Sequence, residues 1–475
     1  MTETSGDVAA APDAAPSWLV PAIIGSALMM QTLNATILSN ALPTMARALQ
    51  VEPLRLNLAI TVYMLANAVF LPISGWAADR FGAKRVFLAA MAMYALGSAA
   101  CGLSSSLLHL VLARAFQGMA GAMMVPVGRL VLLRTTPKAE LVGAMSILTM
   151  PALLGPVIGP PIGGFIVTFW EWRWIFFINL PIAAVGLWLV ARHVPNVQEQ
   201  EAPPIDWIGI GLTGIGMAGL IFGFENLGRD VLPPLAVLAL FLGGGACLWL
   251  YARHAARTPN AILDLSLFRV RTFHASVVGG AFMRLAMGAT PFMLALLLQI
   301  GFGMSPFQAG LLTFISAAGA IVMKTVAPPI LRRFGFRTVL TVNAVITGVT
   351  FLAYGAFRPE TPHWAIMLVL LIGGFFRSLQ FTSLNGLAYA DIDQDRMSRA
   401  STLSAMAQQL VQSVGIGLAA TLLHAFMVAQ GQTRLTAATI APAFLVVGAI
   451  TFVSLVFFLR LPADAGDEMN GRTAR

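Results

Sequence analysis

Long runs of apolar residues, broken by short polar loops, dominate this chain of 475 residues. Lipid offers no water to pair with backbone groups, so a run of about 20 apolar residues that crosses a bilayer must be helical. We therefore expect an all-α integral membrane protein with 14 transmembrane helices. Segment 142–168 is rich in Gly and Pro, and segment 398–428 begins with polar residues. Without these two segments the number of transmembrane helices would be twelve, which is the lower bound. The expected segments are 17–40, 54–77, 86–104, 107–131, 142–168, 174–192, 206–226, 232–252, 273–300, 305–328, 338–357, 363–389, 398–428 and 437–460.

The composition excludes a soluble enzyme. Charged residues make up 10% of the chain, against roughly 25% in soluble proteins. Cys101 and Cys247 lie inside apolar runs without the spacing of metal ligands, and no HExxH, G-x-S-x-G or P-loop motif occurs. We expect no enzyme activity, no metal and no cofactor, and we attribute the net charge of +9 to membrane topology rather than to nucleic-acid binding.

The distribution of Lys and Arg predicts the orientation. With the N-terminus inside, basic residues in the expected cytoplasmic loops outnumber those in the outer loops by about three to one. Both termini are therefore expected in the cytoplasm, which agrees with an even number of helices. A cleavable signal peptide would begin with a positively charged region, but residues 1–16 contain no Lys or Arg. These residues are expected to form a disordered cytoplasmic tail. Residues 462–475 are expected to form a second cytoplasmic tail.

An internal repeat divides the chain. Residues 78–85 read ADRFGAKR and residues 331–338 read LRRFGFRT, 253 residues later. Each is a basic Arg-Phe-Gly turn after the second helix of a block, and parallel repeats of six-helix halves occur in transporters. We expect a six-helix bundle over 17–196, two inserted helices over 205–252, and a second six-helix bundle over 270–461.

Five motifs in order resemble those of the major facilitator superfamily, in its fourteen-helix drug:proton antiporter branch. Residues 33–43 resemble the first-helix pattern LDxTIVNxALP, residues 114–118 the fourth-helix R-x-x-Q-G, and residues 172–181 the start of the sixth helix. The loop signature G-x-L-a-D-r-x-G-r-k is matched by Gly75, Asp79, Arg80, Gly82, Lys84 and Arg85. The fifth-helix antiporter motif is matched by Gly155, Pro156, Gly159, Pro160, Gly163 and Gly164.

This resemblance implies a major facilitator fold of two six-helix bundles plus two extra helices. It also implies a secondary active transporter that exports small molecules by alternating access, of the multidrug-efflux type and with proton antiport. The implied location is the bacterial cytoplasmic (inner) membrane, and the implied partners are the lipid bilayer, a small-molecule substrate and protons, with the chain acting as a monomer. The Asp79 carboxylate can hold the loop turn and a neighbouring helix N-terminus together in one transporter state.

Three arginines lie deep inside expected helices, where a central Arg costs roughly 2.5–3.5 kcal/mol and is expected to face a cavity. They are Arg114, Arg284 and Arg377, whereas Lys324 and Arg129 lie nearer the inner face, where long side chains can snorkel. In the superfamily, the first and fourth helices of each half line the central cavity, and the three deep arginines fall on these helices. The expected cavity residues are Gln31, Asn34, Arg114, Gln117, Arg284, Arg377, Gln380 and Asn385.

Asn34 departs from the branch pattern, which has a membrane-embedded Asp at this position. An amide cannot titrate, so three alternatives stay open: Asn34 replaces a native Asp, coupling resides at Glu225 or Asp79, or transport is not driven by protons. A cavity with three arginines and no carboxylate also favours an alternative substrate class. That alternative is export of anionic substrates, such as organic acids or acidic conjugates, without obligatory proton coupling.

Overall fold

The computed structural model describes residues 18–51, 53–195, 204–227, 232–304, 306–432 and 434–470, and within these ranges all regular structure is helical. The expected tail 1–16 and the last residues of the tail 462–475 lie outside the described residues. We call α1–α8 the first half, α9 and α10 the insert, and α11–α17 the second half. The first half comprises α1 (Leu19–Ala48), α2 (Pro53–Phe70), α3 (Ile73–Phe81), α4 (Ala83–Gly102), α5 (Leu107–Thr135), α6 (Leu141–Phe169), α7 (Trp174–Phe177) and α8 (Asn179–His193).

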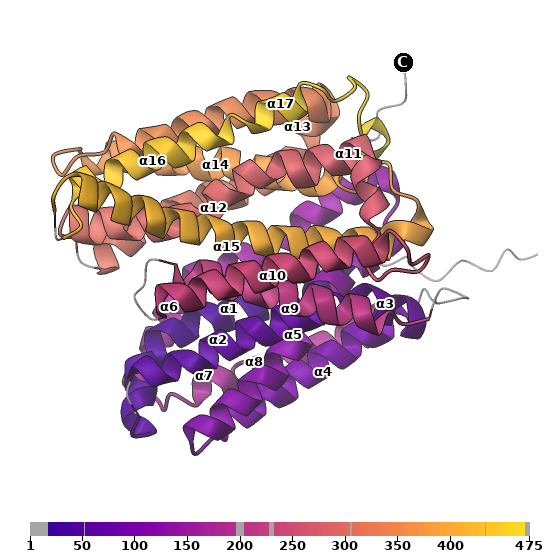
Figure 1. The fold of residues 1–475 in the computed structure, drawn as a ribbon, viewed down its shortest axis with the longest axis horizontal. Helices are drawn as coiled ribbons and strands as arrows, with labels where there is room; N and C mark the ends of the chain where they lie inside the picture. The colour runs from indigo at the N-terminus through magenta and orange to yellow at the C-terminus, as the bar shows by residue number, and fades with distance from the viewer. Residues whose placement is uncertain are drawn as a thin grey trace, which may run out of the picture.

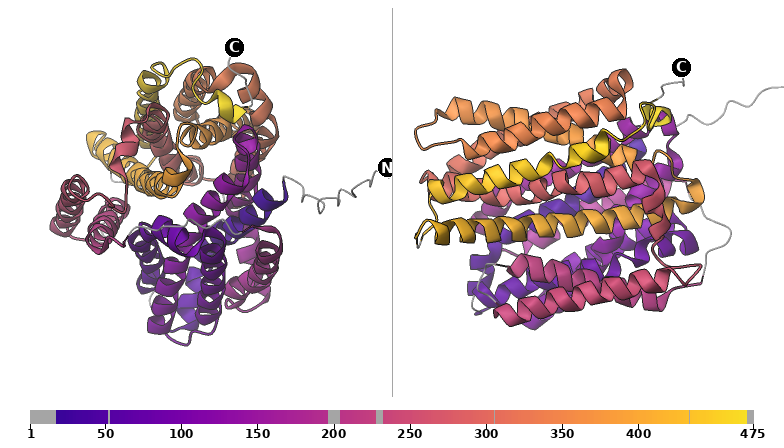
Figure 2. Two further views of the ribbon diagram at one scale, coloured as in Figure 1. Left: turned by 90° about the vertical axis from the view of Figure 1, so that its right-hand side faces the viewer. Right: turned by 45° about the horizontal axis from the view of Figure 1, so that its top comes forward.

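The insert comprises α9 (Trp207–Asn226) and α10 (Pro234–Ala255). The second half comprises α11 (Arg271–His274), α12 (Gly280–Leu296), α13 (Pro306–Gly355), α14 (His363–Leu387), α15 (Met397–Ala429), α16 (Ala437–Thr451) and α17 (Ser454–Phe458). Figure 1 shows the long helices running side by side, with the first half below and the second half above. Figure 2 shows the insert as a separate pair of helices beside the junction of the two halves, where α9 packs against both α2 and α15.

The described helices are long and apolar enough for a membrane protein. Ten of them could cross a bilayer by length and composition, or eleven if α2 and α3, bent by 58° between Phe70 and Ile73, count as one span. Helix α13 covers two of the expected segments, because the chain stays helical on both sides of a kink at Gly335. The described part of the chain thus has an all-helical membrane architecture.

The two Arg-Phe-Gly turns have the same backbone conformation. Gly82, between α3 and α4, has φ 88° and ψ 130°, and Gly335 has φ 75° and ψ 162°. L-residues with a side chain rarely adopt such positive φ values, so glycine is the residue that permits both turns. The sequence repeat therefore corresponds to a structural repeat at equivalent places in the two halves.

The buried apolar core shows where the halves meet. One cluster contains residues of both halves, among them Ala78, next to Asp79 in α3, and Leu403 in α15. At the opposite end each half has its own cluster, around Ile37 in the first half and Phe444 in the second. The halves are therefore packed together at the Asp79 end and separate at the other end.

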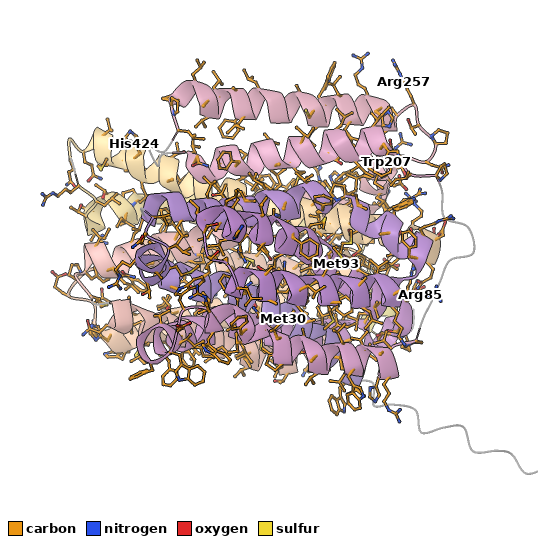
Figure 3. All side chains as sticks on the ribbon, turned by 90° about the horizontal axis from the view of Figure 1, so that it is seen from below. Met30, Arg85, Met93, Trp207, Arg257 and His424 are labelled. Carbon is orange, nitrogen blue, oxygen red and sulfur yellow. The ribbon has the colours of Figure 1, made fainter. Side chains whose placement is uncertain are left out.

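The outer surface is apolar between two polar ends. Large exposed side chains such as Leu242 and Trp249 on α10 lie along the helix sides, as expected for a lipid-facing surface. In Figure 3, Arg85, Trp207 and Arg257 lie at one end of the bundle and His424 lies at the other.

Candidate functional site: a cationic cavity between the two halves

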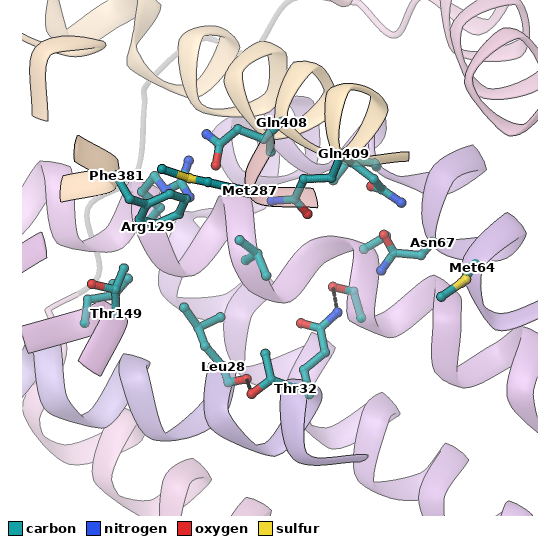
Figure 4. Close-up of a pocket in the computed structure, with 18 of the residues that line it drawn as sticks. Leu28, Thr32, Met64, Asn67, Arg129, Thr149, Met287, Phe381, Gln408 and Gln409 are labelled. Atoms are coloured by element: carbon teal, nitrogen blue, oxygen red, sulfur yellow. Dashed lines mark hydrogen bonds between the residues drawn. The ribbon is translucent and has the colours of Figure 1, made fainter. Parts of the chain in front are cut away.

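A cavity of about 570 Å³ lies between the halves and receives side chains from α1, α2, α5 and α6 of the first half and α12–α15 of the second. Figure 4 shows how these helices surround it. Its polar lining residues are Gln31, Thr32, Tyr63, Asn67, Arg129, Thr149, Lys324, Arg377, Ser378, Gln408, Gln409 and Gln412, and its apolar lining includes Leu28, Met64, Leu71, Val125, Met287 and Phe381.

Three of the lining side chains are cationic, and none of the described lining residues is acidic. Arg377 Nη2 donates to Ser316 Oγ at 3.0 Å, and Lys324 Nζ donates to Thr382 Oγ1 at 2.6 Å. Arg129 Nη1 donates to the Tyr389 hydroxyl at 3.1 Å. All three acceptors are neutral, so the positive charge of the cavity is not neutralised by these partners, and the cavity attracts anions.

Two of the eight expected cavity residues, Gln31 and Arg377, line this cavity. The other six are absent from its lining: Asn34, Arg114, Gln117, Arg284, Gln380 and Asn385, each at most 2% exposed. They lie in the contacts between helices behind the cavity wall. Arg129 and Lys324 line the cavity, whereas Arg114 and Arg284 do not. From the sequence, the side chains of Arg129 and Lys324 were expected to snorkel toward the inner face.

Arg114 belongs to a hydrogen-bonded network inside the first half. Its Nη1 donates to Gln117 Oε1 at 2.5 Å, and Gln117 Nε2 donates to Ser98 Oγ at 2.6 Å. The guanidinium also lies 4.1 Å from the centroid of the Tyr63 ring, whose hydroxyl accepts a hydrogen bond from Gln31 Nε2 at 3.1 Å. Tyr63 and Gln31 line the cavity. Arg114 therefore lies behind the wall and contacts it through the Tyr63 ring.

Asn34 and Gln380 each form a hydrogen bond within their own half. Asn34 Nδ2 donates to the Tyr94 hydroxyl at 2.9 Å, so the position that departs from the branch pattern faces α4 rather than the cavity. Gln380 Oε1 accepts from Asn343 Nδ2 at 2.7 Å. Asn385 lies two residues before the end of α14 and is buried. Glu225 lies near the end of α9, outside the cavity lining.

The loop motif holds the halves together at the Asp79 end. Asp79 Oδ1 accepts from Arg134 Nη2 at 2.8 Å, and Asp79 Oδ2 accepts a short hydrogen bond from Ser398 Oγ at the start of α15. Gly75 allows this approach, since a Cβ at this residue would lie 2.6 Å from Thr402 Oγ1 and 3.1 Å from the Ser398 carbonyl oxygen.

The basic residues of the motif have different surroundings. Lys84 Nζ donates to the Ala191 carbonyl at 2.7 Å and so ties α4 to α8. Arg80 and Arg85 are exposed at the same end. Gly82 provides the turn described above. Asp79 is therefore the member of the motif that links the first half to the second.

The antiporter motif brings α6 close to α1. A Cβ at Gly155 would clash with Thr32 and with the backbone of Leu33, and a Cβ at Gly163 would lie 3.1 Å from Ile37. Gly159 is buried in the same helix. Pro156, Pro160 and Gly164 also belong to α6, but their contacts lie outside what the structure describes. The glycines thus permit close helix packing, which positions Thr32 and Gln31 at the cavity.

The fold, the apolar helices and the central cavity define a membrane transporter of small molecules. The chain matches the Major Facilitator Superfamily over residues 24–415 and 276–473, and it belongs to this superfamily. A protein of Salmonella heidelberg (strain SL476) named "Putative multidrug resistance protein MdtD" is 36% identical over 453 residues, covering 94% of this chain and 95% of the relative. The protein of the same name from Cronobacter sakazakii (strain ATCC BAA-894) is 37% identical over 408 residues, covering 85% and 86%.

Two solved structures share the fold. The human organic anion transporter MFSD10 (TETRAN) aligns with a TM-score of 0.67 at 15% identity, covering 93% of this chain and 99% of that one. The proton:xylose symporter XylE aligns with a TM-score of 0.66 at 12% identity, covering 96% and 98%. The chain is thus a multi-pass membrane transporter of the MdtD multidrug-resistance type and not an enzyme, as the sequence motifs predicted.

Proposed function

We propose that this transporter exports amphipathic organic anions across the bacterial cytoplasmic membrane by alternating access. The observation that carries the proposal is the cavity between the halves, with Arg129, Lys324 and Arg377 in its wall and no acidic residue among its described lining. Leu28, Met64, Val125 and Met287 supply an apolar surface beside these charges, which suits a substrate with an apolar body and an anionic group.

The membrane potential favours this direction of transport. An inside-negative potential of 100 mV lowers the free energy of a monovalent anion that leaves the cell by about 2.3 kcal/mol. The membrane potential alone can drive an anion out of the cell, so this export needs no proton. The lack of a carboxylate among the described lining residues is therefore compatible with transport. The topology proposed here has 14 transmembrane segments, with α13 counted as two, and both termini in the cytoplasm.

Alternating access is supported by the uneven packing of the two halves. Contacts between halves at the Asp79 end include Asp79 to Ser398 and Ser401 Oγ to the Pro126 carbonyl at 3.0 Å. We propose that this end faces the cytoplasm and is closed in the present conformation, and that the 17–196 and 270–461 bundles move about the cavity to open it.

Proton-coupled multidrug efflux is the second candidate, favoured by the description of the MdtD relatives as multidrug resistance proteins. None of Asn34, Glu225 and Asp79, the positions considered for proton coupling from the sequence, lines the cavity. Proton antiport through this cavity would therefore need another titratable group at the wall, and Lys324 is a candidate because lysine, unlike arginine, can lose its proton in proteins.

Flux measurements on the purified chain in proteoliposomes separate the two candidates. Naphthalene-2-sulfonate serves as an amphipathic anion and ethidium as an amphipathic cation, each tested with an imposed potential and, separately, with an imposed pH gradient. We expect potential-driven movement of the sulfonate and little movement of ethidium. Ethidium flux that requires a pH gradient, with no sulfonate flux, would reject anion export in favour of multidrug antiport.

A further inference from the structure

Arg284 in α12 is fully buried and lies beyond the end of the cavity. It is 2% exposed, and its side chain runs back along its own helix to place Nη1 2.7 Å from the Ser276 carbonyl oxygen. A Cβ at Gly280 would lie 2.8 Å from Arg284 Nη1 and 2.9 Å from the Leu384 side chain of α14. Met287, one turn further along α12, lines the cavity. The guanidinium therefore lies between the cavity and the Asp79 end.

Two donor atoms of this guanidinium, Nε and Nη2, have no hydrogen-bond partner among the described residues. Buried polar groups are nearly always hydrogen-bonded, and an unpaired buried cation costs several kcal/mol. The single acceptor that Arg284 contacts is a neutral carbonyl. The site thus presents two unused N–H donors and a positive charge.

The neighbouring charges increase the demand for an anion. Ser276 Oγ donates to the Leu384 carbonyl at 2.6 Å, which places the Arg284 guanidinium beside the segment of α14 that leads to Tyr389, and the Tyr389 hydroxyl accepts from a second cation, Arg129, at 3.1 Å. Neither arginine forms an ion pair within the described part of the chain. Asp391, the carboxylate closest to Tyr389 in sequence, instead accepts a hydrogen bond from Thr272 at 2.9 Å. Two buried like charges are left without an opposite one.

We propose that Arg284, Arg129 and the Tyr389 hydroxyl form a second anion site, which adjoins the Lys324–Arg377 part of the cavity. The site takes one small anionic group, either the sulfonate or carboxylate of the transported molecule or a free inorganic anion. Arg129 comes from the first half and Arg284 and Tyr389 from the second, so the site bridges the two halves and shares Arg129 with the cavity. An anion that enters through the Asp79 end meets this site before the cavity, and in this respect the inference rests on the proposed function.

Uptake of naphthalene-2-sulfonate into everted membrane vesicles tests the site from the Asp79 face. We compare Arg284→Gln, which removes the charge, and Arg284→Lys, which keeps it, with the parent chain. The matched control is Arg253→Gln, which removes an exposed positive charge that stacks 4.8 Å from the Trp249 ring on α10. Arg284→Gln is expected to raise the half-saturating concentration about tenfold or more, with a smaller rise for Arg284→Lys and none for Arg253→Gln.

A thermal unfolding measurement on the purified proteins distinguishes the two sources of the anion. If the site holds a free inorganic anion, added chloride will raise the melting temperature of the parent but not of Arg284→Gln, and the half-saturating concentrations will be equal. If both the uptake and the chloride response are the same in Arg284→Gln as in the parent, the site is rejected. If the parent takes up no sulfonate, the proposed function fails, and the chloride response still decides whether the anion site exists.

Discussion

Lys324 offers the sharpest test of whether the charge of the cavity selects the substrate. Its side chain is nearly inaccessible, at 3% exposure, its Nζ donates to Thr382 Oγ1 at 2.6 Å, and it lies 5.6 Å from the Phe381 ring centroid. Both neighbours are neutral. Lys324→Gln removes the charge but keeps an N–H donor for Thr382, so the variant is expected to fold. Lys324→Arg keeps the charge with a longer side chain.

The size of the effect follows from electrostatics at short range. A unit negative charge about 4 Å from Nζ would be stabilised by about 4 kcal/mol at an effective dielectric constant of about 20. Competition with water reduces the net contribution of such a charge-assisted hydrogen bond to about 1.5–3 kcal/mol. Binding of an anion to Lys324→Gln should therefore be weaker by about ten- to hundredfold, whereas a cation should bind more tightly.

Equilibrium binding of naphthalene-2-sulfonate and of ethidium to the purified protein measures this change directly. We expect the ratio of the two affinities to shift toward ethidium in Lys324→Gln and to stay near that of the parent in Lys324→Arg and in the exposed control Arg253→Gln. If both affinities stay within twofold of the parent in Lys324→Gln, the charge of this residue does not select the substrate, and the electrostatic reasoning is refuted.

Three further predictions concern the motifs. Asp79→Asn removes the negative charge from the buried ion pair between Asp79 and Arg134 and should lower the free energy of unfolding by about 3 kcal/mol, measured by thermal unfolding, and equal stability would show that this pair does not hold the closed end. Gly155→Ala inserts a methyl group between α6 and α1 and should cost about 1–3 kcal/mol, whereas the control Gly143→Ala in the same helix has nothing within 4 Å of its Cβ and should be neutral or slightly stabilising. Asn34→Asp should leave sulfonate flux independent of a pH gradient, because this residue faces away from the cavity, and a new pH-driven component would contradict the placement of the site.

The sequence was sufficient to predict the helical membrane fold and the turns between helices. Backbone groups in uninterrupted apolar runs can be satisfied in lipid only by helices, and the repeated Arg-Phe-Gly pattern indicated two turns, at which Gly82 and Gly335 have positive φ. The loop motif implied that Asp79 holds a neighbouring helix N-terminus, and in the structure Asp79 accepts a hydrogen bond from Ser398 at the start of α15. In each case the residue type itself determines the local structure.

The cavity wall could be predicted only in part, because sequence does not show which way each helix is turned. A membrane helix is apolar on its lipid face and also on its packing face, so no polar stripe marks the side that faces the cavity. Arg114 and Lys324 are both isolated charges in apolar helices, yet Arg114 bonds to Gln117 behind the wall and Lys324 lies in it. Depth in the membrane therefore does not show which of these side chains line the cavity.

The position of α9 has a consequence for how a lipophilic molecule could reach the cavity. Close backbone contacts join α9 to both halves: a Cβ at Gly214 would lie 2.7 Å from the Val69 carbonyl of α2, and one at Gly417 of α15 would lie 2.8 Å from the Phe224 carbonyl of α9. The insert thus covers one lateral seam between the halves, where a gap would otherwise open to the bilayer. A lipophilic molecule in the bilayer therefore meets α9 at this seam, and at the opposite seam it meets α6 packed directly against α13 and α14.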